Sequence, residues 1–358
     1  MPSVEVEIGK GALQKIPKIR EKLKLATSCL IVDDVNTREV AGKDIMDLLQ
    51  GSSYKVSEII VDKPDETNVE RVAEKAGEQD FLIGVGGTSV LDVTKLAAYK
   101  RRARYMLFST GIANNGMSSK TASVYIKGRK ETIPTNMTDA VIVDLAIVSK
   151  APAWMVAAGC GDLVAETTAI KDWQLGRDEM SESYCESVAE LELSALNNTF
   201  SNIDAISRKT EAGIKSLVDS LVKSGLAMTI WGSSRPASGS EHLWSHWLDH
   251  YAEENKTKFG QHGEQVGIGT ILMSKYHELY NGNWWSRERW PKYQAETTMS
   301  LLKKVGAHTT PAEIGVEREL AKQAFLGAWE YRRERYTVLH KRHPTRDDAE
   351  RVMKELGM

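Results

Sequence analysis

Four of the eight histidines fall in one part of the chain and could bind a metal ion. His242, His246 and His250 are spaced at i, i+4 and i+8, so they would line one stripe of a helix, and His262 begins the next helical segment. Two imidazoles and one carboxylate suffice for a catalytic zinc with an open coordination position. The spacing does not decide whether His242 or His246 is a ligand, and a helix with imidazoles at an interface would show the same pattern.

Asp162 is the best carboxylate candidate for this site. It stands in an apolar segment of small residues, 157–165, where a lone charge would be costly to bury. Together with two histidines it would complete the zinc site. The alternative interpretation is an aspartate that caps a helix after Gly161.

A glycine-rich turn in the first half of the chain could bind a phosphate. Residues 81–97 run from an apolar strand through glycines into a helix, with Thr88 or Ser89 as a candidate N-cap. Without Cβ atoms, Gly86 and Gly87 would let a phosphate approach the backbone N–H groups at the helix N-terminus. A tight turn that binds nothing fits equally well, because the sequence is neither GxGxxG nor a Walker loop.

Asp33, at the end of an earlier strand, could hydrogen-bond the adenosine ribose of a dinucleotide. A solvated acidic loop end is the commoner explanation of such a residue. A carboxylate there would favour NAD, whereas Arg38 nearby could accommodate the additional phosphate of NADP. The sequence therefore leaves the cofactor as NAD or NADP.

The pattern of predicted secondary structure changes near residue 150. Before it, strand-like runs alternate with helical ones, which predicts βαβ units and a parallel sheet. The strand candidates are residues 28–32, 54–61, 81–85, 105–108 and 140–144. After it, helical periodicity dominates. We therefore predict an α/β nucleotide-binding domain over 1–150 and an all-helical metal and substrate domain over 151–358, with a ligand cleft between them.

Composition excludes several classes of protein. The 358 residues carry 47 basic and 49 acidic side chains, a formal charge of −2, and 41% are hydrophobic. These values disfavour a disordered chain and a general nucleic-acid binder. Cys29, Cys160 and Cys185 are widely spaced, which argues against a disulfide framework. With no signal peptide and no membrane-spanning run in the sequence, we expect a cytoplasmic protein without an integral membrane segment.

Several segments together resemble the glycerol-1-phosphate dehydrogenase family, within the group that also holds glycerol dehydrogenases, iron-type alcohol dehydrogenases and dehydroquinate synthases. The matching segments keep their order and span nearly the whole chain. They are residues 84–92, 158–162, 171–173, 240–243, 245–246, 262–267 and 335–339.

The resemblance implies roles for the residues of both candidate sites. It makes Asp162, His242 and His262 the metal ligands, with zinc the usual metal and nickel or iron as alternatives, and it makes His246 a proton-relay candidate. The metal would polarise a carbonyl oxygen while the nicotinamide delivers hydride to its carbon. On the nucleotide side, the corresponding residues are Gly86, Gly87, Thr88 and Ser89 in the pyrophosphate loop and Thr110 in contact with the nucleotide.

One loop, residues 109–121, departs from the family pattern. Asn114 and Asn115 stand where the family has His-Asp, so a carboxylate expected near the substrate or nicotinamide becomes a neutral amide. Lys120 follows, in a sequence faintly similar to the Gly-Gly-Lys-Thr of dehydroquinate synthases. Together with Ser118, Ser119 and Thr121 it is our candidate contact to an anionic substrate, although an exposed loop lysine would look the same. Trp244, Trp247, Trp284, Trp285 and Trp290 either reshape the same cleft or belong to the core and interfaces.

The resemblance implies NADH- or NADPH-dependent reduction of dihydroxyacetone phosphate to sn-glycerol 1-phosphate, a step of phospholipid biosynthesis. An alternative is a divergent relative that acts on another phosphorylated polyol or sugar, including a dehydroquinate-synthase-like cyclase with tightly held NAD. A binding or assembly protein without catalysis is a third hypothesis, against which the intact Asp162, His242 and His262 argue. We expect a small phosphorylated substrate, no nucleic-acid partner and a homo-oligomer.

Overall fold

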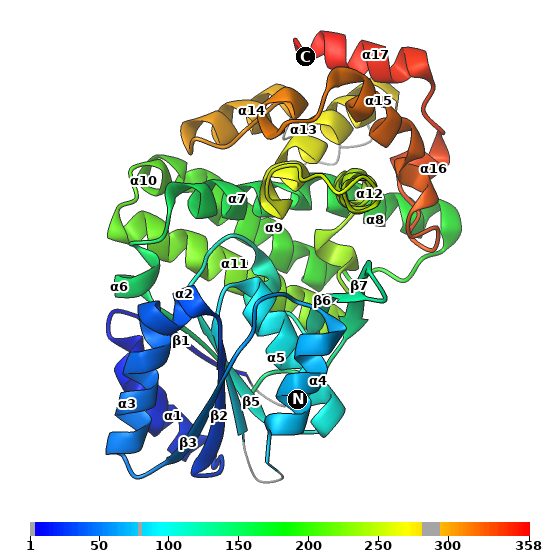
Figure 1. Cartoon of the computed structure of the whole chain (residues 1–358). Coiled ribbons are helices and arrows are strands. Elements are labelled where there is room, and N and C mark those ends of the chain that lie inside the picture. The colour runs from blue at the N-terminus through cyan, green and yellow to red at the C-terminus, as the bar shows by residue number, and fades with distance from the viewer. Residues whose placement is uncertain (1–3, 78–80, 281–293) are drawn as a thin grey trace.

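The chain forms a parallel sheet followed by a group of helices (Figure 1). A computed structural model describes residues 4–77, 81–280 and 294–358. Its six-stranded sheet has every neighbouring pair parallel. In spatial order the strands are β1 (Glu5–Gly9), β8 (Ala140–Asp144), β5 (Tyr105–Ser109), β4 (Phe81–Gly86), β2 (Ser28–Asp33) and β3 (Lys55–Ile60).

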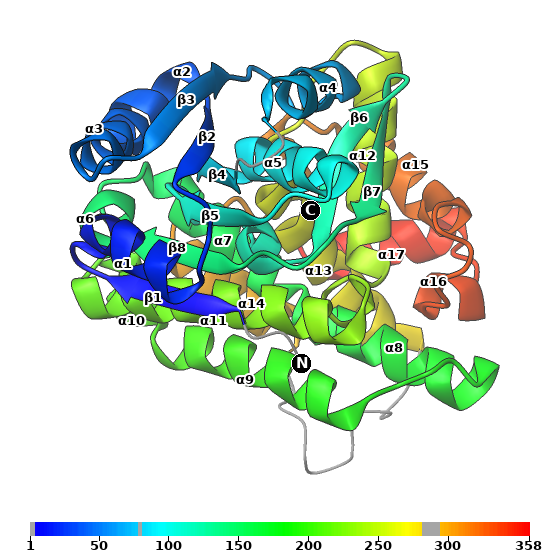
Figure 2. The same ribbon diagram turned by 90° about the horizontal axis from the view of Figure 1, so that it is seen from below.

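Helices cover both faces of this sheet, which explains why its central strands are apolar throughout. Alternate residues of the strands face opposite ways. Ile31 and Ile83 pack in a cluster with α1 (Ile16–Lys22) and α3 (Lys43–Gly51), while Leu30 and Leu82 face α4 (Glu66–Lys75) and α5 (Thr88–Arg101). Figure 2 shows these two helix pairs on opposite sides of the strands.

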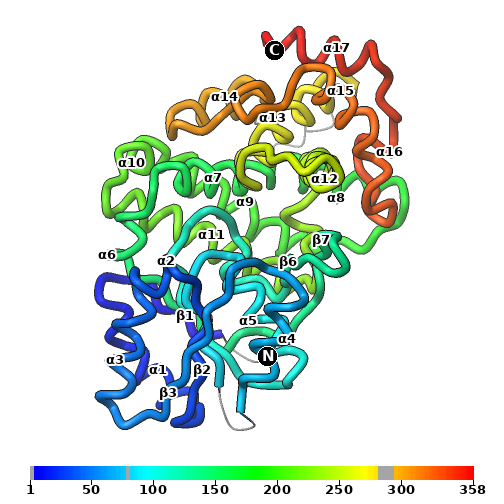
Figure 3. Tube along the Cα trace, in the orientation of Figure 1, coloured from blue at the N-terminus to red at the C-terminus, as the bar shows by residue number. Residues whose placement is uncertain are grey.

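The second half of the chain is helical among the described residues, and the predicted fold class is confirmed. Its main helices are α7 (Ala153–Val164), α8 (Glu166–Met180), α9 (Glu186–Ser201), α11 (Glu211–Trp231), α12 (Ser240–Glu254), α13 (His262–Tyr280), α14 (Ala295–Lys304), α15 (Arg318–Gly327), α16 (Val338–Lys341) and α17 (Arg346–Glu355). The tube in Figure 3 follows the chain from the sheet through α6 (Leu145–Val148) into α7. The predicted division near residue 150 falls in this connection.

One apolar core joins the two halves. Val90 and Leu107 of the sheet half belong to the same buried cluster as Leu163 of α7 and Leu221 of α11. Of the tryptophans noted in the sequence, Trp244 is fully buried and Trp247 stacks on Tyr251, which fits core positions. Trp284, Trp285 and Trp290 lie outside the described residues.

A two-stranded hairpin, not predicted from the sequence, extends from the first half toward α12. It consists of β6 (Thr121–Ile126) and β7 (Arg129–Pro134), paired antiparallel. Lys127 and Gly128 connect them with φ of 49° and 80°, and a two-residue turn with positive φ at both positions matches the twist of the strands it joins. Figure 2 shows the hairpin alongside α12. It therefore carries residues of the first half into contact with the second.

Neither a membrane span nor a disulfide is found in the described part of the chain. None of its helices is both long and apolar enough to cross a bilayer. Cys29 and Cys160 are buried free thiols and Cys185 is a partly buried one, as the odd number and wide spacing of the cysteines suggested.

Candidate active site

A cleft of about 750 Å³ runs between the carboxyl ends of the strands and the helices of the second half. Such an edge is where open parallel sheets bind their ligands. The strand side contributes Asp34, Gly87, Thr88, Ser89 and Ser109, and the helical side contributes Asp162, His242, His246 and His262. The metal candidates and the nucleotide candidates thus share one cavity.

Asp162, His242 and His262 converge at this cleft, with one ligand atom from each lying within 4.8 Å of the others. The Nε2 atoms of His242 and His262 are each 3.9 Å from Asp162 Oδ1. Two ligands about 2.1 Å from a tetrahedral metal would be roughly 3.4 Å apart, so a small contraction would close the site around an ion. The donors are the oxygen and nitrogen ligands that zinc and related divalent metals accept. The predicted triad therefore fits a metal.

Glycines bring the ligands together by letting two helices touch through their backbones. A Cβ on Gly161 of α7 would lie 2.1 Å from the carbonyl oxygen of Gly263, and one on Gly263 would lie 2.1 Å from the carbonyl oxygen of Ala158. Each glycine is adjacent to a ligand, Asp162 on α7 and His262 on α13. The small-residue segment noted in the sequence is thus the contact that sets the distance between these two ligands.

A buried hydrogen-bond network orients the ligands. His242 Nδ1 is 2.8 Å from Glu241 Oε1, so Nδ1 carries the proton and Nε2 presents its lone pair to the site. Thr168 donates to the other oxygen of Glu241 at 2.6 Å. The backbone N–H of Asn115 donates to Asp162 Oδ2 at 2.9 Å. Burial raises the pKa of Asp162 while His242 and this N–H lower it, and a cation between the ligands would favour the carboxylate further.

Asp172, in the matched segment 171–173, fixes the start of the helix that carries His242. Its fully buried carboxylate accepts from the backbone N–H of Ser240 at 2.7 Å and of Val338 at 2.8 Å, and Oδ1 is 3.0 Å from Nε2 of His277. Burial opposes ionisation, but His277 and Ser240 outweigh it, so the pKa of Asp172 is lowered. A single carboxylate thereby links α8, α12, α13 and α16.

His246 lines the cleft but is not part of the triad. Its ring centroid is 6.3 Å from that of His242, one turn earlier on α12. Burial, followed by the charge of Arg332, lowers the pKa of His246 well below its usual value, so the imidazole is neutral. This position agrees with a proton-transfer role and leaves His242 as the ligand of the pair. His250, the third histidine of the stripe, instead pairs with Glu254 at 3.2 Å.

The glycine turn presents the N-terminus of α5 to the other end of the cleft. Gly87 is the N-cap residue, and a Cβ added to it would meet no atom within 4 Å, so its surface is open to the cavity. Gly86 is packed instead, since a Cβ there would lie 2.7 Å from Val90. Thr88 and Ser89 line the cleft, where the backbone N–H groups and the helix dipole favour an anion. Thr110 is buried behind this turn and its N–H donates to the carbonyl of Gly86 at 3.0 Å.

Asp33 does not reach the cleft, in contrast to the expectation from the sequence. As the last residue of β2 it points into the layer of α3, where its fully buried carboxylate lies against Gly42. Burial and the neighbouring Glu58 raise the pKa of Asp33 to about 7. Its neighbour Asp34 lines the cleft, where its Oδ1 accepts from the backbone N–H groups of Asn36 and Thr37 at 2.8 Å. Arg38, considered for an NADP phosphate, pairs with Glu58 at 3.0 Å.

Adjacent residues of the divergent loop contact both ends of the site. Asn114 Nδ2 donates to Thr88 Oγ1 at 2.9 Å, and Asn115, besides its bond to Asp162, donates from Nδ2 to Ser224 Oγ at 3.0 Å. Both asparagines line the cleft. Asn115, whose amide replaces the family carboxylate, thus contacts the triad through its backbone, while its side-chain amide is bonded to Ser224 of α11.

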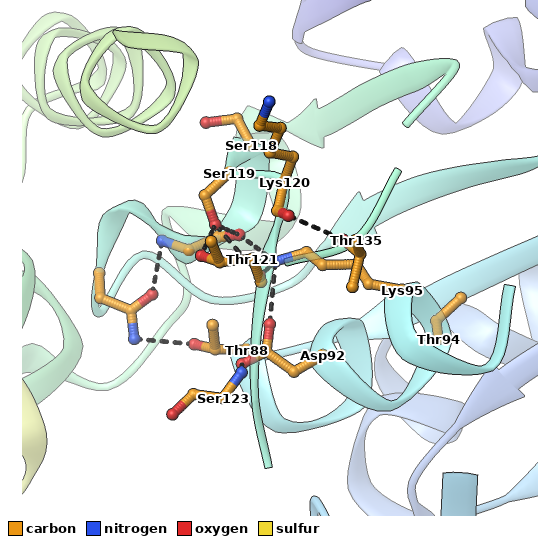
Figure 4. Close-up of polar contacts among 12 residues, drawn as sticks. Thr88, Asp92, Thr94, Lys95, Ser118, Ser119, Lys120, Thr121, Ser123 and Thr135 are labelled. Carbon is orange, nitrogen blue, oxygen red and sulfur yellow. Dashed lines mark hydrogen bonds and ion pairs between the residues drawn. The ribbon is translucent and has the colours of Figure 1, made fainter. Parts of the chain in front are cut away.

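Lys120, our candidate for the substrate anion, is directed away from the cleft. Figure 4 shows its side chain pointing away from Thr88, and its Nζ is the atom that a Cβ on Gly232 would meet at 3.7 Å. Lys95 holds the divergent loop in place, because its buried ammonium donates to the carbonyls of Gly116 and Thr121 and to the carboxylate of Asp92. Ser118 points away as well, whereas Ser119 and Thr121 line the cleft.

Three cations that were not predicted from the sequence reach the cleft. Lys130 comes from β7, Lys258 lies exposed at the rim, and Arg332 precedes the matched segment 335–339. Lys130 could have been found only by predicting the hairpin, which the alternating apolar residues around Lys127-Gly128 indicate. Nothing in the local sequence distinguishes Arg332 from its neighbour Arg333, which is exposed.

Comparison with known proteins identifies the family. Residues 7–152 match the family described as "Iron-containing alcohol dehydrogenase". The glycerol-1-phosphate dehydrogenase [NAD(P)+] of Thermococcus sibiricus is 37% identical over 99% of this chain and 96% of its own length. The chain belongs to the glycerol-1-phosphate dehydrogenase family. The enzyme of the same name from Pyrococcus furiosus is 36% identical over 99% and 97%. The predicted family is confirmed.

Solved structures with the same fold are more distant in sequence from this family member. Glycerol dehydrogenase from Schizosaccharomyces pombe superposes with a TM-score of 0.76 at 17% identity, covering 99% of this chain and 91% of that one. Maleylacetate reductase from Agrobacterium tumefaciens superposes with a TM-score of 0.78 at 13% identity, covering 99% and 96%. These likenesses establish the fold of an α/β half followed by a helical half.

Proposed function

We propose that the protein reduces dihydroxyacetone phosphate to sn-glycerol 1-phosphate with NADH or NADPH, at a divalent metal held by Asp162, His242 and His262. The observation that carries the proposal is the placement of this triad across one cleft from the N-terminus of α5. Full-length relatives at 36–37% identity that are named glycerol-1-phosphate dehydrogenase [NAD(P)+] support the choice of substrate and cofactor.

Different residues of the cleft would hold the metal, orient its ligands and transfer the proton. A bound metal, most simply zinc, would polarise the substrate carbonyl. Glu241 orients His242, and the N–H of Asn115 orients Asp162, so the ligands are positioned before any ion enters. His246, neutral and beside His242, accepts the hydroxyl proton at an imidazole nitrogen in the oxidation direction and returns it in the reduction direction.

The nucleotide would bind along the strand side of the cleft. The pyrophosphate would lie against Gly87, Thr88 and Ser89 at the N-terminus of α5, because that end of the helix combines free N–H groups with a favourable dipole. Asp34, rather than Asp33, is the carboxylate placed to meet a ribose hydroxyl. With Arg38 paired to Glu58, we propose that NAD(H) is used at least as well as NADP(H).

The test is oxidation of NADH or NADPH by dihydroxyacetone phosphate, followed at 340 nm. Turnover should be lost after chelation, return on addition of zinc, and be absent in Asp162→Asn. Nickel and iron, tested in the same way, would identify the preferred metal. Lack of turnover with the metal-replete protein would overturn the substrate claim. Tightly held NAD with no net change in absorbance would favour the cyclase alternative, which loses the support of Lys120 but keeps that of Asn115 and Thr121, both of which line the cleft. A homo-oligomeric assembly and a cytoplasmic location stay predictions.

A further inference from the structure

The wall of the cleft beside the triad carries a positively charged side chain without a counter-ion. Arg332 lines the cavity, and its guanidinium forms no ion pair with any carboxylate of the described residues. Its neighbours there are hydroxyls: Nη2 donates to Thr132 Oγ1 at 2.8 Å, and Nη1 is 3.5 Å from Ser234 Oγ. Five N–H groups are available on a guanidinium, so these contacts leave donors for a ligand.

Backbone strain and desolvation both make the observed position of Arg332 energetically unfavourable. Its backbone has φ of 48°, in the left-handed region that non-glycine residues rarely adopt. Burial lowers its pKa, which means that its charge is incompletely solvated. Behind it, Arg335 shares the hydroxyl of Ser234 at 3.2 Å and donates to the carbonyl of Ser238 at 3.0 Å. An anion in the cleft would relieve both the desolvation and the repulsion between the two arginines.

Arg332 lies on the metal side of the cleft. The ring of its neighbour Tyr331 packs edge-on against His250 of α12, with 5.7 Å between the ring centroids, so Arg332 directly follows a contact with the helix that carries His242. The other two cations of the cleft are less suited to hold an anion. Lys130 is neutralised by Asp249 at 2.9 Å, and Lys258 is exposed at the rim.

We propose that Arg332 binds the phosphate of the substrate, with the hydroxyls of Thr132 and Ser234 beside it, and that this contact selects a phosphorylated ketone over its unphosphorylated analogue. The inference rests on the proposed function. The carbonyl of the substrate would bind at the triad, and its phosphate dianion would bind at Arg332. A planar guanidinium presents paired donors that match phosphate oxygens. Thr132 acts as a positioning residue, because it holds the guanidinium in place from the hairpin.

The experiment compares Arg332→Met with Arg333→Met, which removes an exposed arginine next in sequence. For dihydroxyacetone phosphate, R332M should lower kcat/KM roughly 10–100-fold, mainly through KM, as expected for charged hydrogen bonds. With dihydroxyacetone, which lacks the phosphate, R332M and wild type should agree within about twofold. R333M should match wild type with both ketones. Equal zinc content and NADH binding in all three proteins would show that R332M is folded.

Other outcomes would overturn the assignment. It fails if R332M and R333M have the same kcat/KM for dihydroxyacetone phosphate, or if Lys258→Met raises the KM and R332M does not. Should wild type turn over neither ketone, the proposed function fails, and Arg332 is then judged by calorimetry with inorganic phosphate alone. Binding by wild type and R333M but not by R332M would support the anion site even then, and equal binding by all three would refute it. Thr132→Val should weaken phosphate binding less than R332M does.

Discussion

Replacing Glu241 by glutamine tests whether the network behind His242 controls the affinity for metal. Glu241 is fully buried, and its carboxylate accepts three hydrogen bonds, from His242 Nδ1 at 2.8 Å, the backbone N–H of Gly239 at 2.6 Å and Thr168 Oγ1 at 2.6 Å. Glutamine has the same shape and keeps one acceptor oxygen. The hydroxyl of Thr168 can rotate to accept from the new amide, so we expect E241Q to fold.

The magnitude follows from the one contact that strengthens when a metal draws charge from His242. A hydrogen bond to a charged group contributes about 1.5–3 kcal/mol and a neutral one about 0.5–1.5 kcal/mol, so the loss is about 1–2 kcal/mol. That corresponds to a roughly 5–30-fold weaker metal affinity, within the range typical of residues that orient ligands. Competition with a chromophoric chelator would measure the zinc affinity directly.

Glu254→Gln is the matched control, since Glu254 lies on the same helix and contacts His250 instead of a ligand. E254Q should bind zinc as tightly as wild type. If E241Q also binds zinc within twofold of wild type while remaining folded, Glu241 does not orient His242 energetically and the reasoning is refuted. Circular dichroism of the metal-free proteins separates this result from a loss of folding.

Three further predictions concern the cleft and the sheet. Gly87→Ala should leave stability nearly unchanged, because the added methyl group meets no atom, but it should weaken NADH binding at least about tenfold. Gly51→Ala, whose methyl group is equally unhindered, should change neither stability nor NADH binding. Fluorescence titration of NADH measures the difference. Because the pKa of Asp33 is raised to about 7 in the folded protein, the free energy of unfolding of wild type falls as pH rises from about 4 to 7, and Asp33→Asn should remove up to about 4 kcal/mol of that loss. Urea unfolding at pH 5 and pH 8 should therefore show the variant gaining stability relative to wild type at the higher pH. Parallel pH profiles of the two proteins would contradict this prediction. His246→Asn should lower kcat by about 10²–10⁴-fold without changing zinc content, and unaltered kcat would exclude proton transfer through His246.

The sequence alone pointed to the candidate metal ligands and the candidate phosphate turn because both depend on short-range features. The i, i+4 histidines and the small residues around Asp162 reflect helix periodicity and close packing, and Gly86 and Gly87 mark a turn whose role is local. Choosing His242 over His246 required the family resemblance, since one helical stripe presents both imidazoles to the same side.

What the sequence left undetermined depends on register and on long-range contacts. Asp33 ends the buried strand β2 and Asp34 follows it as the N-cap of α2 (Val35–Thr37), so the exact end of the strand decides which carboxylate reaches the cleft. Lys120 was assigned to the substrate by analogy, but the loop that carries it turns its side chain outward. Arg332 reaches the cleft because of contacts with Thr132, 200 residues earlier, which no local pattern reveals.

The adjacent asparagines of the divergent loop have a thermodynamic consequence. Asn114 bonds to Thr88 at the nucleotide turn while the N–H of Asn115 bonds to the ligand Asp162, so ordering of this short segment by one ligand prepares the position of the other. Any such coupling must be reciprocal: if zinc tightens the binding of NADH by some factor, NADH must tighten the binding of zinc by the same factor. The metal would then be held most firmly when the nucleotide is bound, which would make retention of the ion a response to occupancy of the nucleotide site.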